Sequence, residues 1–545
     1  MSRLGSMQSW PLRVMKLVDH AEQEHGSGEI VSAWADGSIT RTNWRTVASD
    51  ARKMAQALEK QGLKPGDRVA TLAMNHARHL VAWYGAIGMG GVLHTINPRL
   101  FPDQLDYIAN HAEDRVLLYD AAFAPLVEAM KPRWTTIEKY VCFDPPEGWA
   151  GDEAFEAWIA CYDGNYQWID GDERDPCGLC YTSGTTGNPK GVLYEHRSTI
   201  LHAWAEIAPD CFNLSARSSV LPIVPMFHAN AWGVPWAAPL TGCKLVLSAD
   251  YRPDKMVKLF REENITHSAG VPTIWLTMIQ HIENTGEDLG PIKAVTIGGS
   301  AAPPAMIKWF NEREIYVGHA WGMTETSPIG TLGAPPQNWD DLSDTEQLAY
   351  CSRQGRIPFG VELRTVDDDG KVLPRDGVSS GELQVRGAWV LQRYFKANED
   401  AVDADGWFST GDVAALHPDG TMQITDRSKD VIKSGGEWIS SIELENAAVG
   451  FEGVLEAAAI GIPHPKWDER PLLVLVRREG CDVNKAALRD HLATQVAKWW
   501  LPDAIEFVDE LPHTATGKLS KKTLREQFEG YRFPDACERM EELRR

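Results

Sequence analysis

The stretch Tyr181-Thr-Ser-Gly-Thr-Thr-Gly-Asn-Pro-Lys190-Gly191 is the most informative part of this sequence. Its glycines would let backbone N–H groups approach an anion closely, while its hydroxyl groups add hydrogen-bond donors and its lysine adds positive charge. This composition predicts a phosphate-binding loop rather than a polar surface turn. The loop is not a Walker A motif, which needs Gly-Lys-Ser/Thr, because Pro189 precedes the lysine here.

The segments on both sides of this loop alternate between helix and strand signals. A helical stripe of apolar residues runs from Val47 to Leu58 and is closed by Gly62. Strands are expected at Val69–Met74, Val92–Ile96, Arg115–Tyr119, Lys244–Ser248, Thr266–Ala269, Ala294–Ile297 and Tyr316–His319. Helical stretches lie between them, and this alternation is typical of mostly parallel sheets covered by helices.

The pattern changes twice in the last third of the chain. Helices are missing around 361–386, which predicts a β-rich section. After Asp426 a mixture of helices and strands predicts a small α+β domain. The charged junction Asp426-Arg427-Ser428-Lys429-Asp430 is the best linker candidate. We therefore predict an α/β protein with a large N-terminal domain of several subdomains, residues 1–426, and a C-terminal domain, residues 427–545.

Composition excludes several classes of protein. The 545 residues are 43% hydrophobic and 24% charged, as in ordinary globular proteins, and their formal net charge of −22 argues against a general nucleic-acid binder. Nine cysteines are too few for a disulfide framework and favour a reducing compartment. No apolar run is long enough to predict a secretory signal or a membrane span, so a cytoplasmic location is expected.

Two short motifs resemble a zinc site and a dinucleotide-binding loop but are better explained otherwise. Cys177 and Cys180 form a single C-x-x-C without a second ligand pair, so ordinary buried thiols are expected rather than zinc. Gly85-x-x-Gly88-x-Gly90-Gly91 lies late in a helical pattern, whereas a dinucleotide loop joins a strand to a helix start. Close helix packing is the better interpretation of these glycines.

Five further motifs follow the loop. They are Gly298-Gly-Ser-Ala-Ala-Pro303, His319-Ala-Trp-Gly-Met-Thr-Glu325, Ser409-Thr-Gly-Asp412, Asp426-Arg-Ser-Lys-Asp-Val-Ile-Lys-Ser-Gly-Gly-Glu437 and Thr516-Gly-Lys518. With the loop they resemble, in the same order, the motifs of the adenylate-forming superfamily, which contains acyl-CoA synthetases, nonribosomal-peptide adenylation domains and beetle luciferases. The matches span about residues 180–520, and several ordered motifs are far more specific than any one of them.

The resemblance implies an enzyme that uses ATP, Mg²⁺ and coenzyme A to convert a carboxylic acid to an acyl-adenylate and then to an acyl-CoA. Glu325 would bind Mg²⁺, Thr324 the α-phosphate, and Asp412 and Arg427 the ribose. The implied nucleotide-binding residues are Thr182, Ser183, Gly184, Thr185, Thr186, Lys190, Gly299, Ser300, Ala301, His319, Ala320, Trp321, Gly322, Met323, Thr324, Asp412 and Arg427.

The resemblance also implies a mobile C-terminal domain. Lys518 would enter the site for adenylation, and rotation near the hinge Lys429 would then withdraw it. Gly435 and Gly436 would line the path of the pantetheine arm of coenzyme A. Relatives also make a homodimer plausible.

The segment Pro225-Met-Phe-His-Ala-Asn-Ala-Trp232 bears on the acid. It resembles a segment of bacterial fatty acyl-CoA synthetases, in which His228 would lie beside the reacting carboxylate and Trp232 would gate the acyl tunnel. Core packing is the alternative for both residues. The segment lacks the aspartate that pairs with an amino group in amino-acid-activating relatives. The expected pocket residues are His228, Trp232, Trp236, Gly299, Pro303 and Trp321.

Several indoles in this pocket favour a short- or medium-chain acid, and the sequence is similar to the branch of medium-chain fatty acid and 3-(methylthio)propionate CoA ligases. One methylene changes binding by only about 1–3 kcal/mol, so the acid stays open. Alternatives are a long-chain fatty acyl-CoA synthetase and a non-catalytic nucleotide-binding homologue. The latter is opposed by the joint presence of Lys190, Glu325, Asp412 and Lys518. A kinase or NTPase is opposed by the missing Walker motif.

Overall fold

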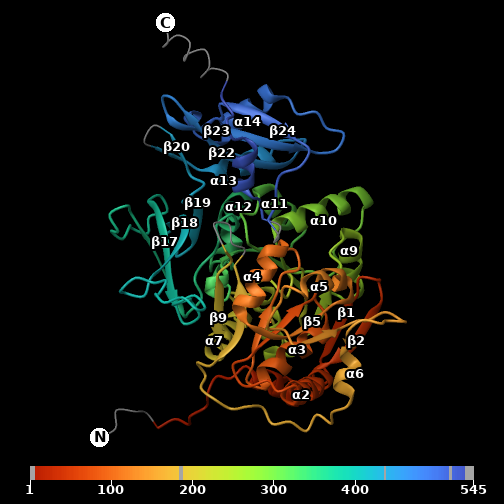
Figure 1. The fold of residues 1–545 in the computed structure, drawn as a ribbon. Helices are drawn as coiled ribbons and strands as arrows, with labels where there is room; N and C mark the ends of the chain where they lie inside the picture. Colours follow the sequence, from red (N-terminus) through yellow and green to blue (C-terminus); the bar gives the residue numbers. More distant parts are fainter. Residues whose placement is uncertain (1–5, 183–187, 435–436, 515–517, 534–545) are drawn as a thin grey trace.

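The structure is a computed structural model that describes residues 6–182, 188–434, 437–514 and 518–533. Two large sheets with their helices form the lower body in Figure 1, a small sheet lies beside them, and the chain after residue 430 forms a separate layer above. The predicted α/β fold class, with a β-rich section and a small C-terminal α+β region, is confirmed.

The first large sheet carries the phosphate loop. Its strand order is β7 (Glu153–Ala154), β6 (Lys139–Cys142), β5 (Asp114–Tyr119), β3 (Arg68–Leu72), β4 (Val92–Thr95), β8 (Pro176–Tyr181) and β9 (Gly191–Glu195). All neighbours are parallel except β8 and β9. The expected strands at 69–74, 92–96 and 115–119 are β3, β4 and β5, so this part of the prediction is confirmed.

The second large sheet carries the segments expected to bind adenine and the acid. Its order is β15 (Ile329–Leu332), β14 (Tyr316–Gly322), β13 (Ala294–Ile297), β12 (His267–Gly270), β10 (Ser219–Pro222), β11 (Lys244–Ser248), β1 (Glu29–Ala33) and β2 (Ile39–Asn43). Its central strands are parallel, and β15 and β2 run antiparallel at the edges. The carboxyl ends of parallel strands form one edge, where ligand-binding loops gather.

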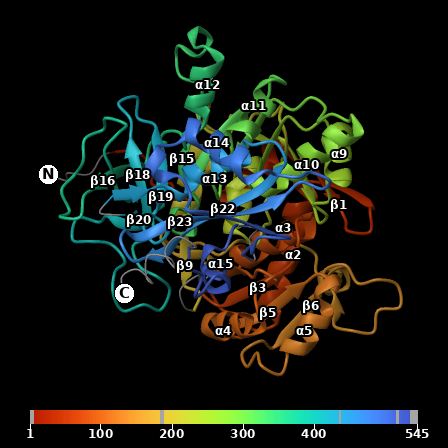
Figure 2. The same cartoon turned by 90° about the horizontal axis from the view of Figure 1, so that it is seen from above.

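Two smaller sheets complete the fold. The antiparallel sheet of β16 (Val361–Val366), β17 (Ser380–Gly387), β18 (Phe408–Leu416) and β19 (Met422–Arg427) is the predicted β-rich section. The C-terminal sheet contains β21 (Glu437–Ile439), β20 (Ile432–Ser434), β23 (Asp468–Arg477) and β22 (Val454–His464), and β24 (Ala504–Val508) pairs with β23. Seen from above, the C-terminal layer lies over the middle of the body, and β3, β5 and β6 are visible beside it (Figure 2).

Helices cover the large sheets and the C-terminal sheet. Those of the body are α1 (Met15–Glu24), α2 (Trp44–Lys60), α3 (Ala77–Gly88), α4 (Pro102–Ala112), α5 (Ala124–Met130), α6 (Phe155–Ala160), α7 (His196–Ile207), α8 (Val234–Thr241), α9 (Pro253–Glu262), α10 (Pro272–Thr285), α11 (Pro304–Asn311) and α12 (Asp344–Cys351). The C-terminal layer has α13 (Ser441–Val449), α14 (Lys485–Gln495) and α15 (Lys521–Gln527).

The packing of α2 against α3 explains the glycine-rich motif. The predicted apolar stripe of α2 is buried, and the Asn43 side chain caps the helix by accepting from the Thr46 backbone N–H. A Cβ atom at Gly85 would lie 2.9 Å from the Met54 side chain of α2, and one at Gly88 would lie 2.3 Å from Trp168. These glycines therefore serve close packing, as predicted.

The structure also bears on two other expectations from the sequence, the C-x-x-C pair and the membrane spans. Cys177 and Cys180 are buried on β8, and burial raises the pKa of both thiols, to about 12 and about 11. The prediction of ordinary buried thiols is confirmed. Among the described residues, no helix combines the length and the apolar character that crossing a bilayer requires.

Candidate active site

The phosphate loop joins β8 to the antiparallel strand β9, with Tyr181 paired to Gly191. Two hydrogen bonds close its base, because the Thr182 N–H donates to the Lys190 carbonyl at 2.9 Å and the Lys190 N–H donates to Thr182 Oγ1 at 3.2 Å. Ser183, Gly184, Thr185 and Thr186 lie outside the described residues. Lys190 is exposed, with Nζ 4.7 Å from the centre of the Tyr394 ring.

The residues predicted for the ribose come together through the register of β18 and β19. Asp412 and Arg427 are cross-strand partners, and Arg427 Nε lies 3.1 Å from Asp412 Oδ1. The Trp321 indole N–H donates to the other oxygen, Oδ2, at 2.8 Å. Asp412 is only 1% exposed, so these two donors fix the orientation of a buried carboxylate.

Thr324 and Glu325 lie on the single 3₁₀ turn η3 (Thr324–Thr326), just beyond β14. The Thr324 carbonyl accepts a hydrogen bond from the Tyr194 hydroxyl at 2.8 Å, and Glu325 Oε1 accepts one from the Tyr394 hydroxyl at 2.7 Å. No group of three possible metal ligands occurs among the described residues. One carboxylate still fits Mg²⁺, which protein sites often hold through one or two carboxylates together with substrate phosphates.

The segment expected to bind adenine connects β13 to α11 and contains Gly299, Ser300 and Ala301. His319, on the neighbouring strand β14, is buried behind it. Its Nε2 accepts from the Ala302 backbone N–H at 3.3 Å and its Nδ1 lies 3.2 Å from the Ser352 carbonyl, while burial lowers its pKa to about 4. The neutral ring therefore holds the segment through its backbone. Ala320, Trp321 and Gly322 continue β14, and Met323 follows.

Lys518 reaches this cluster from the C-terminal layer. A Cβ atom placed on Gly299 would lie 3.3 Å from Lys518 Cε and 3.8 Å from the Trp232 indole. Burial and the charge of Arg427 lower the pKa of Lys518 to about 8, while Asp412 and Glu325 act in the opposite direction. The structure thus brings together the lysine, the predicted ribose carboxylate and the predicted metal carboxylate.

The segment after His228 has an unusual backbone. Asn230, Ala231 and Trp232 all have φ between 51° and 55°, so a left-handed turn, η2 (Ala229–Gly233), carries the predicted gate. Residues other than glycine rarely adopt this conformation, which costs them roughly 1–2 kcal/mol each. Alanine and tryptophan carry no sequence signal for it. His228 precedes the turn, and burial and Lys518 lower its pKa to about 3, so the ring is neutral.

The predicted pocket residues do not all line one cavity. A cavity of about 280 Å³ lies beside His228 and is also lined by Arg99, Tyr251, Val271, Thr273 and Ile274, among others. Of the predicted pocket residues, only His228 lines it. Trp236 packs in the core against Trp83, with ring centres 4.7 Å apart, and Trp321 faces Asp412. The pocket-wall roles of Trp232, Trp236, Gly299, Pro303 and Trp321 stay predictions.

The hinge region is attached to the C-terminal layer. The Lys429 carbonyl accepts from the Arg525 guanidinium at 3.1 Å, and Arg525 also pairs with Asp430 at 2.5 Å. Asp426, one residue before Arg427, accepts from the Ser441 N–H and hydroxyl. Gly435 and Gly436 lie outside the described residues. The domain boundary at 426 and the pivot at Lys429 stay predictions.

Sequence reasoning missed two tyrosines of the site. Tyr194 holds the Thr324 carbonyl, and Tyr394 touches both Lys190 and Glu325. Tyr394 lies between β17 and β18, in a stretch without a recognisable motif. Only the tertiary contacts connect Tyr394 with Lys190 and Glu325.

The model of the "AMP-binding enzyme" family matches residues 18–395, and that of its C-terminal domain matches residues 443–518. The chain belongs to the AMP-binding enzyme family. It is 50% identical to a 3-methylmercaptopropionyl-CoA ligase of Ruegeria lacuscaerulensis over 96% of this chain and 99% of that protein. It is 46% identical to a medium-chain-fatty-acid–CoA ligase of Ectopseudomonas oleovorans over 96% and 97%.

A solved anthranilate CoA ligase, AuaEII in complex with anthranoyl-AMP, shares the fold with a TM-score of 0.85. The match covers 95% of this chain and 98% of that one, at 24% identity. The resemblance to adenylate-forming enzymes drawn from the ordered motifs is confirmed by the family match and by this likeness of fold.

Proposed function

We propose that this chain is an ATP-dependent acid–CoA ligase whose acid is a short- or medium-chain fatty acid or 3-(methylthio)propionate. The observation that carries the proposal is the position of Lys518, which reaches from the C-terminal layer to Gly299 and to the Asp412–Arg427 pair. A nucleotide-binding protein without catalysis has no use for a lysine at this place. The family and the names of the relatives support the same chemistry.

The first step couples the acid to AMP. A carboxylate is a poor acyl donor because its leaving group would be oxide. One carboxylate oxygen attacks the α-phosphorus of ATP, the new P–O bond forms, and the bond to pyrophosphate breaks. Several anionic groups meet, so electrostatic stabilisation dominates. Lys518 bridges the carboxylate and the α-phosphate, Thr324 donates to the α-phosphate, Lys190 holds the departing phosphates, and Asp412 accepts from the ribose hydroxyls.

Glu325 is the residue that would hold Mg²⁺ in this reaction. When bound, Mg²⁺ neutralises charge on the phosphates. His228 is neutral at physiological pH, because its pKa is about 3, and a neutral ring beside the acid carboxylate brings no second positive charge next to Lys518. Lys518 thus supplies the positive charge beside the acid carboxylate, and His228 shapes the site there without adding charge.

The second step transfers the acyl group to the thiol of coenzyme A. The sulfur attacks the carbonyl carbon, the acyl–phosphate bond breaks, AMP leaves, and the thiol proton is released. Lys518 occupies the site in the present arrangement, so it must withdraw, and we assign that movement to rotation near Lys429. Gly435 and Gly436 then line the path of the pantetheine arm.

We assign the cavity beside His228 to the pantetheine arm as well. Its lining includes Thr273 and Tyr251, and the buried Tyr251 hydroxyl has no hydrogen-bond partner among the residues that the structure describes. An aliphatic acyl chain would leave such groups unpaired, at a cost of about 1–3 kcal/mol each, whereas the amides of pantetheine can pair with them. Arg99, which is exposed and lines the same cavity, suits the phosphates of coenzyme A.

The test measures ATP consumption with and without coenzyme A, using straight-chain acids from acetate to palmitate and 3-(methylthio)propionate, also called 3-methylmercaptopropionate. AMP and ADP are resolved, and Lys518→Ala is the control. AMP formation that needs both acid and coenzyme A is expected, with the highest kcat/KM for a short or medium acid. A preference for palmitate would favour the long-chain alternative, ADP would indicate a kinase, and no product would favour the nucleotide-binding alternative.

Two further parts of the proposal concern the oligomeric state of the protein and its location in the cell. A homodimer is expected from relatives, and sedimentation velocity of the purified chain tests it. A cytoplasmic location is expected from the sequence, and fractionation of cells that express the chain tests it.

A further inference from the structure

We propose that Tyr394 is a positioning residue, which sets the phosphate-binding lysine and the metal-binding carboxylate at a defined distance from each other. The proposal rests on the function proposed above. The Tyr394 hydroxyl donates to Glu325 Oε1 at 2.7 Å, and Lys190 Nζ lies 4.7 Å from the centre of the same ring. One side chain thus contacts two groups that come from different sheets.

The two contacts of Tyr394 are chemically distinct. Its hydroxyl engages one oxygen of Glu325, and no described residue makes a hydrogen bond to the other, which leaves Oε2 for a ligand. Its ring attracts the Lys190 ammonium through a cation–π interaction.

The backbone around Tyr394 is fixed on both sides. The Leu391 N–H donates to the Glu325 carbonyl at 2.8 Å, and the Phe395 N–H donates to the Gly191 carbonyl at 2.8 Å, at the end of the phosphate loop. Residues 391–395 are therefore tied to the metal segment and to the loop by their backbone. A side chain held in this way can orient its partners rather than follow them.

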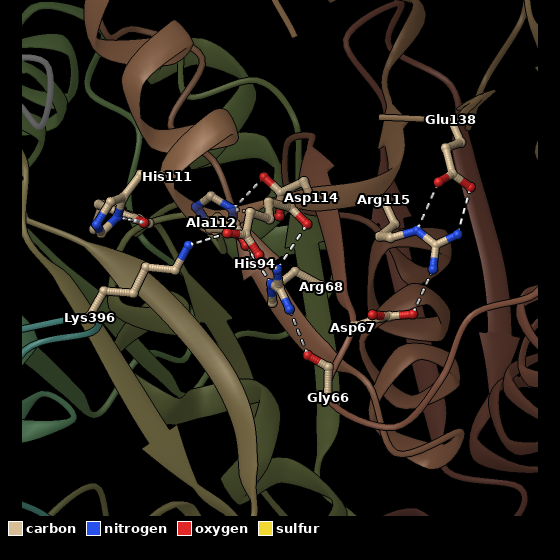
Figure 3. A network of polar contacts seen from close by, with 12 residues as sticks. Gly66, Asp67, Arg68, His94, His111, Ala112, Asp114, Arg115, Glu138 and Lys396 are labelled. Atoms are coloured by element: carbon tan, nitrogen blue, oxygen red, sulfur yellow. Dashed lines mark hydrogen bonds and ion pairs between the residues drawn. The ribbon is translucent and has the colours of Figure 1, made fainter. Parts of the chain in front are cut away.

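A third attachment comes from Lys396, whose ammonium lies 2.6 Å from Glu113 Oε1. Figure 3 shows Lys396 reaching toward the polar network around Arg68 and Asp114, the first residues of β3 and β5 in the first large sheet. The Phe395 ring also packs edge-on against His111, which contacts the Tyr181 hydroxyl. Residues 391–396 therefore form a strap, in which Tyr394 is the member that contacts Lys190 and Glu325.

The in-line displacement needs the phosphates and their cation held in one geometry. Without the hydroxyl, the Glu325 carboxylate can turn, whereas the ring can still attract Lys190. Tyr394→Phe is therefore expected to weaken the metal-dependent part of nucleotide binding, because a hydrogen bond to a charged group typically changes an equilibrium by about 10-fold or more. Tyr394→Leu also removes the ring and is expected to weaken metal-free binding.

The experiment measures the dissociation constant of α,β-methylene ATP with and without Mg²⁺, in the full chain and in both variants. Tyr119→Phe is the matched control, because the Tyr119 hydroxyl donates to Asp152 Oδ2 at the same 2.7 Å, on β5 and outside the site. Tyr394→Phe should weaken binding about 10-fold in Mg²⁺ and less than 2-fold without it. Its KM for the acid in pyrophosphate exchange should be unchanged.

Two results with Tyr394→Phe would overturn the proposal. One is an affinity of Tyr394→Phe that matches the wild type in Mg²⁺, and the other is an equal loss with and without Mg²⁺. A loss that Tyr119→Phe reproduces would also count against it, as a general effect on stability. Pyrophosphate exchange by the wild type separates the two proposals, because its absence contradicts the ligase while the nucleotide affinities still test Tyr394.

Discussion

The charge of Lys518 is expected to limit adenylation at alkaline pH. Its pKa falls from 10.5 to about 8 in the docked arrangement, because burial and Arg427 disfavour the ammonium more than Asp412 and Glu325 favour it. The difference corresponds to about 3 kcal/mol at most. Docking the charged lysine is therefore costly before substrate binds, and the anionic substrates offset that cost.

The sign of the pH dependence follows from the direction of this shift. Below about pH 8 the docked lysine is charged, and the cost of docking it is present in full. As the pH rises from about 8 toward 10.5, the lysine docks in its neutral form and the cost disappears. The rate of adenylation is nevertheless expected to fall over the same pH range, because the neutral amine cannot stabilise the charge that develops at the α-phosphate.

The assay compares two half-reactions across pH 6.5 to 10. ATP–pyrophosphate exchange reports adenylation, and conversion of presynthesised acyl-adenylate to thioester reports the second step. Exchange by the wild type, measured as kcat/KM so that it reports the enzyme without substrate, should fall above about pH 8. Lys518→Ala should lose about 10²–10³ in exchange and lose this alkaline fall, while thioester formation changes little. Lys522→Ala is the control, because that lysine is exposed four residues along the same segment.

The reasoning would be refuted by an alkaline fall that persists in Lys518→Ala, since another group would then be titrating. Equal losses in both half-reactions would remove the selective role of Lys518 in adenylation. A similar loss in Lys522→Ala would point to a general effect of charge on the C-terminal layer.

Three other predictions concern single residues of the site. Asp412→Asn should raise the KM for ATP by about 10-fold or more while the KM for the acid stays constant, because a buried charged acceptor becomes a weaker neutral one; an unchanged KM in exchange kinetics would contradict a ribose contact. Lys429→Pro should slow thioester formation and spare exchange, and normal turnover in that variant would argue against domain rotation. Arg99→Ala should raise the KM for coenzyme A and leave the KM for the acid unchanged. An equal rise in the KM for the acid would instead assign the cavity beside His228 to the acyl chain.

Local patterns were enough to predict most elements of the fold. The apolar stripe of α2 and the apolar runs of β3, β4 and β5 appear where periodicity placed them, because neighbouring residues decide these signals. The change to a β-rich section near residue 361 and to a mixed α+β region after Asp426 could also be predicted from the sequence. Strand order was not, since the pairing of β1 with β11 joins segments about two hundred residues apart.

The left-handed turn before α8 shows where local reasoning fails. Nothing in Ala229, Ala231 or Trp232 favours a positive φ, and the surrounding structure imposes it. Gly233 ends the turn at φ 89°, and a Cβ atom there would lie 2.4 Å from the Glu206 carboxylate. Trp236 shows the same limit, because only the structure reveals that its ring packs 4.7 Å from that of Trp83, while its role in the pocket wall stays a prediction.

The sequence by itself determined the class of chemistry, since the ordered motifs carry the groups that phosphate, ribose and a carboxylic acid require. Only the tertiary structure decided which of these groups meet. Register pairs Asp412 with Arg427, the docked C-terminal layer brings Lys518 to Gly299, and Tyr394 connects Lys190 with Glu325. The physical reason is that the type of a residue fixes which chemical groups it can offer, whereas the distance between two residues far apart in the sequence depends on how whole sheets and layers pack.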